Sequence, residues 1–486
     1  GRAADLPLSG RGEVTATLTP DDQDGQRVAV SGAFTGLALP DGGPKAARLT
    51  LDGRIDGAFT DPEAAIELAL SDAAAGPAEL DTLTARADGT LAGLNLRLSA
   101  RGRMDAPLTL DAAANLALAE GAQELRVSEL DLALGERRLA LRQPATLRSE
   151  GERLSVEDVV LGMDDGTLSL SLTQGEDRID ATLDAQQVPL SFTGLVLAQP
   201  KLSGRLDGTV DLAGPLDRPG GTVDLTLSQV EMDGTDLPPV DMALTSRLDG
   251  GRATVDARLT GLGQTPVELQ ADLPVEVSLD PATARLRDQD QLDGALSWAG
   301  EVAPLMPLVP VTGHRLTGLA DLTFQLTGTA ADPRVTGRAT LNRGRYENLD
   351  TGTLLTDLAL TVTAEGRRLT ITRFEARDGG SGTLSIAGGL TLDPEQDVPV
   401  DISVSADSAK LARLDYLEAD ADVDLDVTGT LQDMRVAGEI AVLQAEVRVP
   451  DSLPPEVVNL EAVTEADVRR TRKEEEQAQR TGTAAP

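Results

Sequence analysis

The chain has 486 residues and a formal net charge of −37, from 80 acidic and 43 basic residues, and it contains no cysteine. Such a surface repels nucleic-acid phosphates and anionic lipid headgroups, so neither is expected as a partner of the surface. The lack of cysteine excludes disulfides, thiolate nucleophiles and cysteine-ligated metals. Aromatic residues make up 2% of the chain, which disfavours thick globular cores, whereas 40% hydrophobic residues argue against disorder.

Hydrophobic and polar residues alternate along most of the chain, and the alternation is lost in residues 461–486. In DLTFQLT (321–327), the hydrophobic residues share one face and the polar residues share the other. Period two predicts strands with one apolar and one wet face. The residues expected to line the apolar face are Leu168, Leu170, Leu172, Leu322, Phe324, Leu326, Leu358, Leu360, Val362, Leu384, Ile386, Val423, Leu425 and Val427.

Short turn signals separate these strands. The runs 147–156 and 361–371 both reverse at Glu-Gly, and the run 246–255 reverses at Asp-Gly-Gly. Glycine supplies the positive φ of tight hairpins, and such short connections favour antiparallel neighbours. At about 12 residues per strand and turn, the chain would hold roughly 40 strands.

One sequence motif recurs along the chain. Gly214, Gly328 and Gly429 align, and Pro219, Pro333 and Met434 each follow five residues later. We interpret these positions as structural corners of a long meander. They divide the chain into an N-terminal β-rich part (1–186), three repeat units (187–301, 302–407 and 408–460) and a charged tail (461–486), which is expected to be a flexible linker.

Three stretches lack clear alternation and precede the corners: 189–199, 302–310 and 409–419. The last has helical spacing at Leu411, Leu414 and Leu417. We expect short helices or loops against the sheet at these places.

Residues that could act in catalysis or bind a metal ion are scarce. The single histidine, His314, excludes a two-histidine zinc site, and a polar turn residue is the favoured interpretation. The acidic run 21–25 and the alternating aspartates 420–426 lack the pattern of a calcium loop and are interpreted as solvated. Trp298, Tyr346 and Tyr416 are expected to be structural anchors. The sequence therefore predicts no enzyme, no catalytic residue, no metal site and no cofactor.

A sheet with one apolar face must cover that face. A filled sandwich, a closed barrel and an open trough are all solutions, and the small lining residues Leu, Val and Ala favour the trough. The fold class expected is all-β: an elongated, mostly antiparallel meandering sheet curled into a trough with an apolar interior, plus a few short helices. No run reaches the roughly 20 apolar residues of a membrane-spanning helix. Because the sequence begins at Gly1, we interpret it as a piece of a longer chain.

The segments 303–322, 328–392 and 436–463 resemble the TamB family, within the AsmA-like group of Gram-negative envelope proteins. The resemblance is strongest between about residues 187 and 463. It suggests a middle fragment that lacks the family's N-terminal anchor and its distinctive C-terminal region.

The resemblance implies a parent protein anchored in the inner membrane that crosses the periplasm toward an outer-membrane barrel partner of the TamA type. It further implies translocation and assembly of outer-membrane proteins, and phospholipid transport between the two membranes along an apolar β-groove. Phospholipid acyl chains or unfolded outer-membrane protein clients would then be the ligands.

Two alternatives stay open. One is a pure assembly scaffold, which offers sheet edges to incoming strands without a lipid conduit. The other is a surface β-solenoid adhesin or enzyme, for which the sequence shows no clustered polar site.

Overall fold

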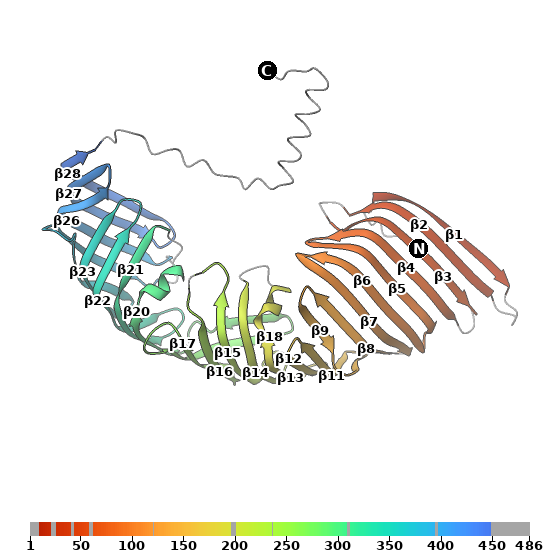
Figure 1. Ribbon diagram of the computed structural model, residues 1–486. Helices are drawn as coiled ribbons and strands as arrows, with labels where there is room; N and C mark the ends of the chain where they lie inside the picture. The colour runs from red at the N-terminus through yellow and green to blue at the C-terminus, as the bar shows by residue number, and fades with distance from the viewer. Residues whose placement is uncertain are drawn as a thin grey trace, which may run out of the picture.

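The computed structural model describes residues 9–20, 26–39, 43–57, 62–119, 121–195, 201–235, 237–308, 312–393 and 397–448. They form one elongated, arched sheet with β1 at one end and β28 at the other (Figure 1). The acidic run 21–25 and the tail 461–486 lie outside the described residues. The all-β prediction is confirmed, and the described part holds 28 strands rather than roughly 40, because single strands reach 16 residues.

The first part of the sheet comprises β1 (Ser9–Pro20), β2 (Gln26–Ala38), β3 (Lys45–Asp56), β4 (Glu63–Ala75), β5 (Ala78–Thr90), β6 (Gly93–Met104), β7 (Ala106–Ala119), β8 (Ala122–Leu134), β9 (Arg137–Leu141), β10 (Ala145–Glu150), β11 (Arg153–Met163), β12 (Gly166–Gln174) and β13 (Arg178–Pro189), followed by the 3-10 helix η1 (Leu190–Leu195).

The second part comprises β14 (Leu202–Pro215), β15 (Gly220–Met232), β16 (Val240–Asp249), β17 (Arg252–Thr260), β18 (Val267–Leu279), β19 (Ala282–Leu286), β20 (Asp293–Glu301), the 3-10 helix η2 (Ala303–Leu308), β21 (His314–Gly328), β22 (Pro333–Asn348), β23 (Thr353–Gly366), β24 (Arg368–Arg377), β25 (Thr383–Thr391), β26 (Pro399–Leu414), β27 (Leu417–Thr430) and β28 (Met434–Val447).

Nearly every strand pairs antiparallel with its neighbours in sequence. The predicted reversals are confirmed, since Glu150 pairs with Arg153, Glu365 with Arg368 and Asp249 with Arg252. Two places depart from the simple meander. The short strands β9 and β10 both pair with β8 and β11, and β18 divides its length between β19 and β20.

The pairing register keeps apolar residues on one face of the sheet. A line of directly opposite residues, which we call row A, crosses 17 strands from β1 to β18 and contains only apolar residues and glycine. Its members are Leu18, Val28, Ile55, Ala64, Gly89, Leu94, Leu116, Leu125, Leu147, Val156, Leu172, Ala181, Leu212, Gly221, Leu248, Ala253 and Leu273.

A second such line, row B, continues on the same face to the last strand. It contains Leu141, Leu161, Leu168, Ala185, Gly208, Leu225, Leu244, Ala257, Leu269, Leu296, Phe324, Gly337, Ala364, Leu369, Leu390, Val400, Gly429 and Met434. We call the face that carries both rows the apolar face.

The opposite face is hydrophilic along the same strands. The register line next to row B is polar at every position from β12 to β25 except Ala295. It contains Ser169, Asp184, Thr209, Asp224, Thr245, Asp256, Gln270, Ala295, Gln325, Thr336, Glu365, Arg368 and Thr391. Because the side-chain period of a strand is two, a slip of one residue in any pair would exchange the two faces.

Bulges bend the strands at recurring places. Gln187, Gln229 and Ser408 adopt positive φ where the register shifts by one residue. The backbone N–H of each donates to an aspartate of the next strand, at 2.8 Å for Asp207, 2.7 Å for Asp241 and 2.7 Å for Asp422. A bulge bends its strand and increases the local twist, so these bulges curl the sheet across its width.

The repeated glycines stand at hairpin turns. Gly328 ends β21 opposite Pro333, and Gly429 lies opposite Met434 at the β27–β28 turn. Both have positive φ, and a Cβ atom would lie 2.4 Å from the Asp332 carbonyl oxygen and 2.3 Å from the Asp433 carbonyl oxygen, respectively. Gly214, the residue before the last of β14, has the same sign of φ, and Pro219 is fully buried just before β15. The recurring sequence motif thus forms the same type of hairpin turn at three places in the chain.

Two of the three predicted irregular stretches contain short helices, η1 within 189–199 and η2 within 302–310. The third prediction is wrong, because 409–419 forms the end of β26 and the start of β27. Cross-strand pairing, with Leu414 opposite Leu417, overrides the helical spacing of the leucines. Each strand packs on its neighbours within the sheet, and no second sheet covers it among the described residues, so the filled sandwich is not observed.

The turn glycines provide a test of the corner interpretation. Gly429→Ala should destabilise the β27–β28 hairpin by roughly 2–3 kcal/mol, from the strain of positive φ plus the clash with the Asp433 carbonyl oxygen. Gly366→Ala is the matched control, since its φ is also positive but no atom lies within 4 Å of the added Cβ. Amide hydrogen exchange should accelerate in β27 and β28 only for Gly429→Ala. Equal exchange in both variants would contradict this role.

The apolar face as candidate functional site

All fourteen residues predicted to line a groove lie on strands and on the apolar face. Leu168 and Phe324 belong to row B, and Leu172 belongs to row A. Leu358 and Val423 are buried, with exposed fractions of 5% and 8%, and the other twelve are half-buried. The structure therefore brings the predicted residues onto one surface. Whether that surface carries lipid remains a prediction.

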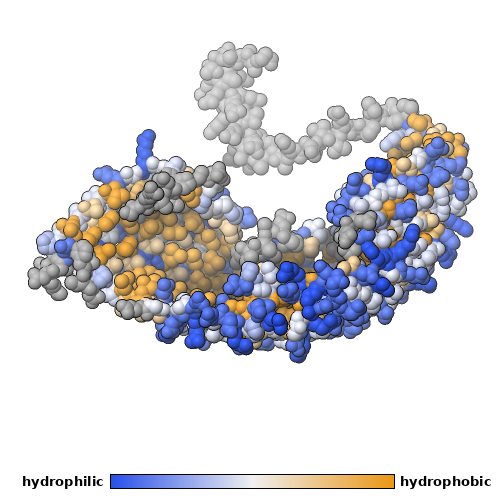
Figure 2. Space-filling model, turned by 180° about the vertical axis from the view of Figure 1, so that it is seen from behind, coloured by the Kyte–Doolittle hydropathy of each residue, from blue (hydrophilic) through white to orange (hydrophobic). Residues whose placement is uncertain are grey.

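The apolar face is largely open. Side chains pack densely in three places: around Phe192 of η1, around Leu341 and Leu358, and around Ala409. Between these clusters most apolar side chains keep part of their surface accessible. Figure 2 shows hydrophobic residues over the hollowed inner surface of the N-terminal end, and hydrophilic residues over the outer surface of the arch.

The length of this face determines what it can bind. At about 4.8 Å between strands, row A extends roughly 75 Å and row B roughly 80 Å along the sheet. Both exceed the roughly 30 Å hydrocarbon core of a bilayer. Neither row contains a charged or polar side chain, so an extended apolar ligand could occupy any part of them without desolvating an ion.

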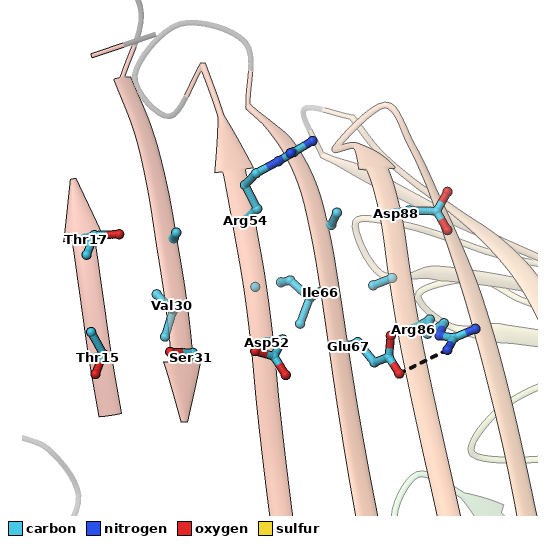
Figure 3. A pocket seen from close by; sticks show the side chains of 14 residues that line it. Thr15, Thr17, Val30, Ser31, Asp52, Arg54, Ile66, Glu67, Arg86 and Asp88 are labelled. Atoms are coloured by element: carbon cyan, nitrogen blue, oxygen red, sulfur yellow. Dashed lines mark hydrogen bonds and ion pairs between the residues drawn. The ribbon is translucent and has the colours of Figure 1, made fainter. Parts of the chain in front are cut away.

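Many charged residues on the opposite face form ion pairs with one another. A hollow of about 520 Å³ lies on this face near β1 to β5. There Arg86 pairs with Glu67 of the neighbouring strand at 3.0 Å (Figure 3). Asp52 and Ser31 lie on the two preceding strands, β3 and β2. Exposed pairs of this kind contribute roughly 0.2–1 kcal/mol each. Nearby, a hydrogen bond from the Arg27 guanidinium lowers the pKa of Asp56. Among the described residues this face is exposed to solvent and rich in polar side chains.

The aromatic residues have unequal roles. Trp298 is buried, with an exposed fraction of 5%, which fits the predicted anchor. Tyr346 is half-buried, and burial raises its pKa; its hydroxyl lies 2.6 Å from Nδ1 of His314, the first residue of β21. Tyr416 has an exposed fraction of 55% in the β26–β27 turn, so its predicted role as an anchor is wrong.

Several structural aspartates were missed by the sequence interpretation. Asp422 was interpreted as solvated but accepts a hydrogen bond from the bulge at Ser408. Asp378 is buried, and its carboxylate accepts N–H groups of Gly380, Gly382 and Lys410 at 2.7 to 3.1 Å. The Gly-rich run after Asp378 is the signal that could have found it. Within the described residues no group of three or more His, Asp and Glu side chains is arranged to hold a metal ion.

Part of this sheet is similar to a known protein family. The family model described as the TamB C-terminal domain matches residues 372–486, which begin within β24 and include β25 to β28. The resemblance to the TamB family is confirmed. The matched region is similar to the C-terminal domain of the TamB family, whereas the sequence suggested a middle fragment without that region. The match supports a TamB-like protein of the cell envelope. No helix in the described ranges is long and apolar enough to cross a membrane.

Two curated relatives share part of the chain. Protein TIC236, chloroplastic, of Arabidopsis thaliana is 26% identical over 173 residues, and Protein SUBSTANDARD STARCH GRAIN 4, chloroplastic, of Oryza sativa subsp. japonica is 28% identical over 173 residues. Each alignment covers 35% of this chain but 8% of the relative's length. No solved structure matches the chain.

The absence of native cysteine permits a direct test of which face each residue occupies. We expect a polarity-sensitive dye on Leu326→Cys to emit at shorter wavelength than the same dye on Gln325→Cys, because the former lies on the apolar face and the latter on the hydrophilic face. Equal emission from the two adjacent sites would show that the apolar face is not a distinct environment. Circular dichroism of both labelled proteins is the control for folding.

Proposed function

We propose that this chain is a section of a TamB-like envelope protein that conducts phospholipid between two membranes along its apolar face. The continuity of rows A and B over the described strands carries the proposal. Acyl chains would lie against the leucine, valine and alanine side chains, and the hydrophilic face would stay in water. The proposed carrier is not an enzyme, and it needs no catalytic residue, metal or cofactor.

The wider setting of the proposal comes from the TamB family. The parent protein would be anchored in the inner membrane of a Gram-negative bacterium, and this section would lie in the periplasm. Its partner at the outer membrane would be a barrel protein of the TamA type. Translocation and assembly of outer-membrane proteins would accompany the lipid transport.

A triple substitution tests the lipid proposal. Leu326→Asp, Leu360→Asp and Leu425→Asp together place three carboxylates on the apolar face, where an acyl chain can cover them only at a cost of several kcal/mol. We expect gently purified wild-type protein to carry several phospholipids per chain by quantitative mass spectrometry, and the triple variant to lose most of them.

The matched control is Gln325→Asp, Thr361→Asp and Thr428→Asp, which adds three carboxylates to the hydrophilic face of the same strands. The control should retain its lipid. Lipid-free wild-type protein with a native circular dichroism spectrum would overturn the proposal, as would equal loss of lipid in both triple variants.

One observation favours a second function, strand augmentation without lipid. All fourteen residues of β28 are exposed, including Val436 at 60%, Ile440 at 58% and Val442 at 62%. Within the described residues β28 pairs only with β27, so its other edge offers free N–H and C=O groups. An unfolded outer-membrane protein client could add a strand there.

Proline tests this alternative. Val436→Pro and Ala437→Pro remove one backbone donor each, and because the N–H groups of successive residues point to opposite edges, one of the two removes a donor from the free edge. That variant should reduce photocrosslinking of a client strand to β28 several-fold. Thr19→Pro, in the edge strand β1 at the other end of the sheet, serves as the control. Client crosslinking that persists at the wild-type level in both β28 variants would count against augmentation at this edge.

A further inference from the structure

The strand β18 leaves the main sheet halfway along its length. Residues 268–272 pair with β20, whereas residues 275–279 pair with β19. Pro274 is fully buried at the point of departure, and it has no N–H to give to the ladder. We call the outgoing segment, Val275–Leu286, the side hairpin. It lies against the ends of other hairpins, since Leu279 N donates to Leu216 O at 2.7 Å and Val275 N to Gly251 O at 3.0 Å.

A cavity of about 980 Å³ lies between the side hairpin and these hairpin ends. One wall is the β14–β15 turn at 217–219, another is the β16–β17 turn at Gly250 and Gly251, and the third is the side hairpin itself. Leu248, a member of row A, also lines the cavity. The cavity therefore joins the apolar face at the place where row A ends.

Three arginines line this cavity: Arg218, Arg285 and Arg287. The carboxylates in the lining are Asp217 and Glu276, and Asp290, outside the lining, pairs with Arg287. Three arginines thus stand beside three carboxylates, in a chain whose acidic residues outnumber the basic ones by 80 to 43. Arg287 donates through Nη2 to Gly251 O at 3.0 Å and pairs through Nη1 with Asp290 at 3.0 Å. These two contacts fix its position at the wall.

The other two guanidinium groups are held less firmly. Arg285 forms an ion pair with Glu276 at 3.5 Å, and its side chain has an exposed fraction of 69%. The Arg218 side chain makes no ion pair or hydrogen bond with the residues that the structure describes. Guanidinium groups match the geometry of phosphate oxygens and bind them with two parallel hydrogen bonds. A cavity whose lining combines arginines with Leu248, Pro219 and Val277 suits a ligand with a phosphate and an apolar part.

We propose that this cavity binds the phosphodiester headgroup of an anionic phospholipid whose acyl chains lie on the apolar face beside Leu248. This inference rests on the lipid function proposed above and specifies a headgroup site for it. The volume of about 980 Å³ is larger than a free phosphate needs and falls within the usual range of small-molecule sites, roughly 300–1,000 Å³. Free phosphate shares the headgroup's chemistry, and the test separates the two.

The test uses isothermal titration calorimetry with three probes: short-chain phosphatidylglycerol, diacylglycerol with the same acyl chains, and inorganic phosphate. In the variant Arg218→Gln/Arg285→Gln we expect the Kd for phosphatidylglycerol to rise at least about tenfold, because the variant loses hydrogen bonds from charged donors to the phosphate. Diacylglycerol binding should not change. The control variant Arg103→Gln/Arg258→Gln removes two arginines that pair with Glu79 and Glu268 and do not line the cavity; it should bind all three probes like wild type.

Each other result overturns the inference in a distinct way. Unchanged phosphatidylglycerol binding in the Arg218→Gln/Arg285→Gln variant would exclude the headgroup site while leaving the apolar conduit intact. Inorganic phosphate that binds as tightly as phosphatidylglycerol, and loses affinity equally in the variant, would assign the cavity to free phosphate. Wild-type protein that binds neither acyl-chain probe would overturn the conduit itself.

Discussion

The whole molecule depends on in-register pairing between sequence neighbours. Backbone hydrogen bonds fix which residues stand opposite each other, and the two-residue period then sends every second side chain to one side. With no second sheet over the apolar face among the described residues, register is what keeps apolar side chains together. The hairpin turns fix this register. Gly328 and Gly429 therefore matter beyond their own turns, because a change of turn length would exchange the faces of the strands that follow.

A trough also requires a curved sheet. In this protein β-bulges formed by polar residues bend the strands. The bulges at Gln187, Gln229 and Ser408 each hold a positive φ that a non-glycine residue adopts at some cost. An aspartate on the next strand satisfies the N–H group that the bulge would otherwise leave unpaired. The acidic residues of this chain are thus partly structural, in addition to keeping its outer face wet.

The fold was predictable from sequence where local rules decide it. Alternation around Phe324 and Leu360 identifies both the strand and the face, and Glu-Gly at 150–151 and 365–366 identifies the reversals. Local sequence patterns give the wrong prediction where pairing between strands determines the structure. The helical spacing of Leu411, Leu414 and Leu417 gives way to a β-hairpin, and Pro274 marks an interruption in β18 without indicating which strand pairs beyond it. Arg218 and Arg285 share a cavity only because the side hairpin folds back, so their spacing of 67 positions shows nothing by itself.

The pairing of strands that are neighbours in sequence also determines how the sheet can fold and how it can open. Almost every contact joins strands that are adjacent in the chain, as in repeat proteins whose stability is a sum of nearest-neighbour interfaces. Contacts of short sequence separation close with small loop entropy, so the growing chain can add one strand at a time as it emerges from synthesis or from a membrane pore. By the same logic, a break between two neighbouring strands stays local. The sheet can therefore open at one point along its length while the remainder keeps its shape.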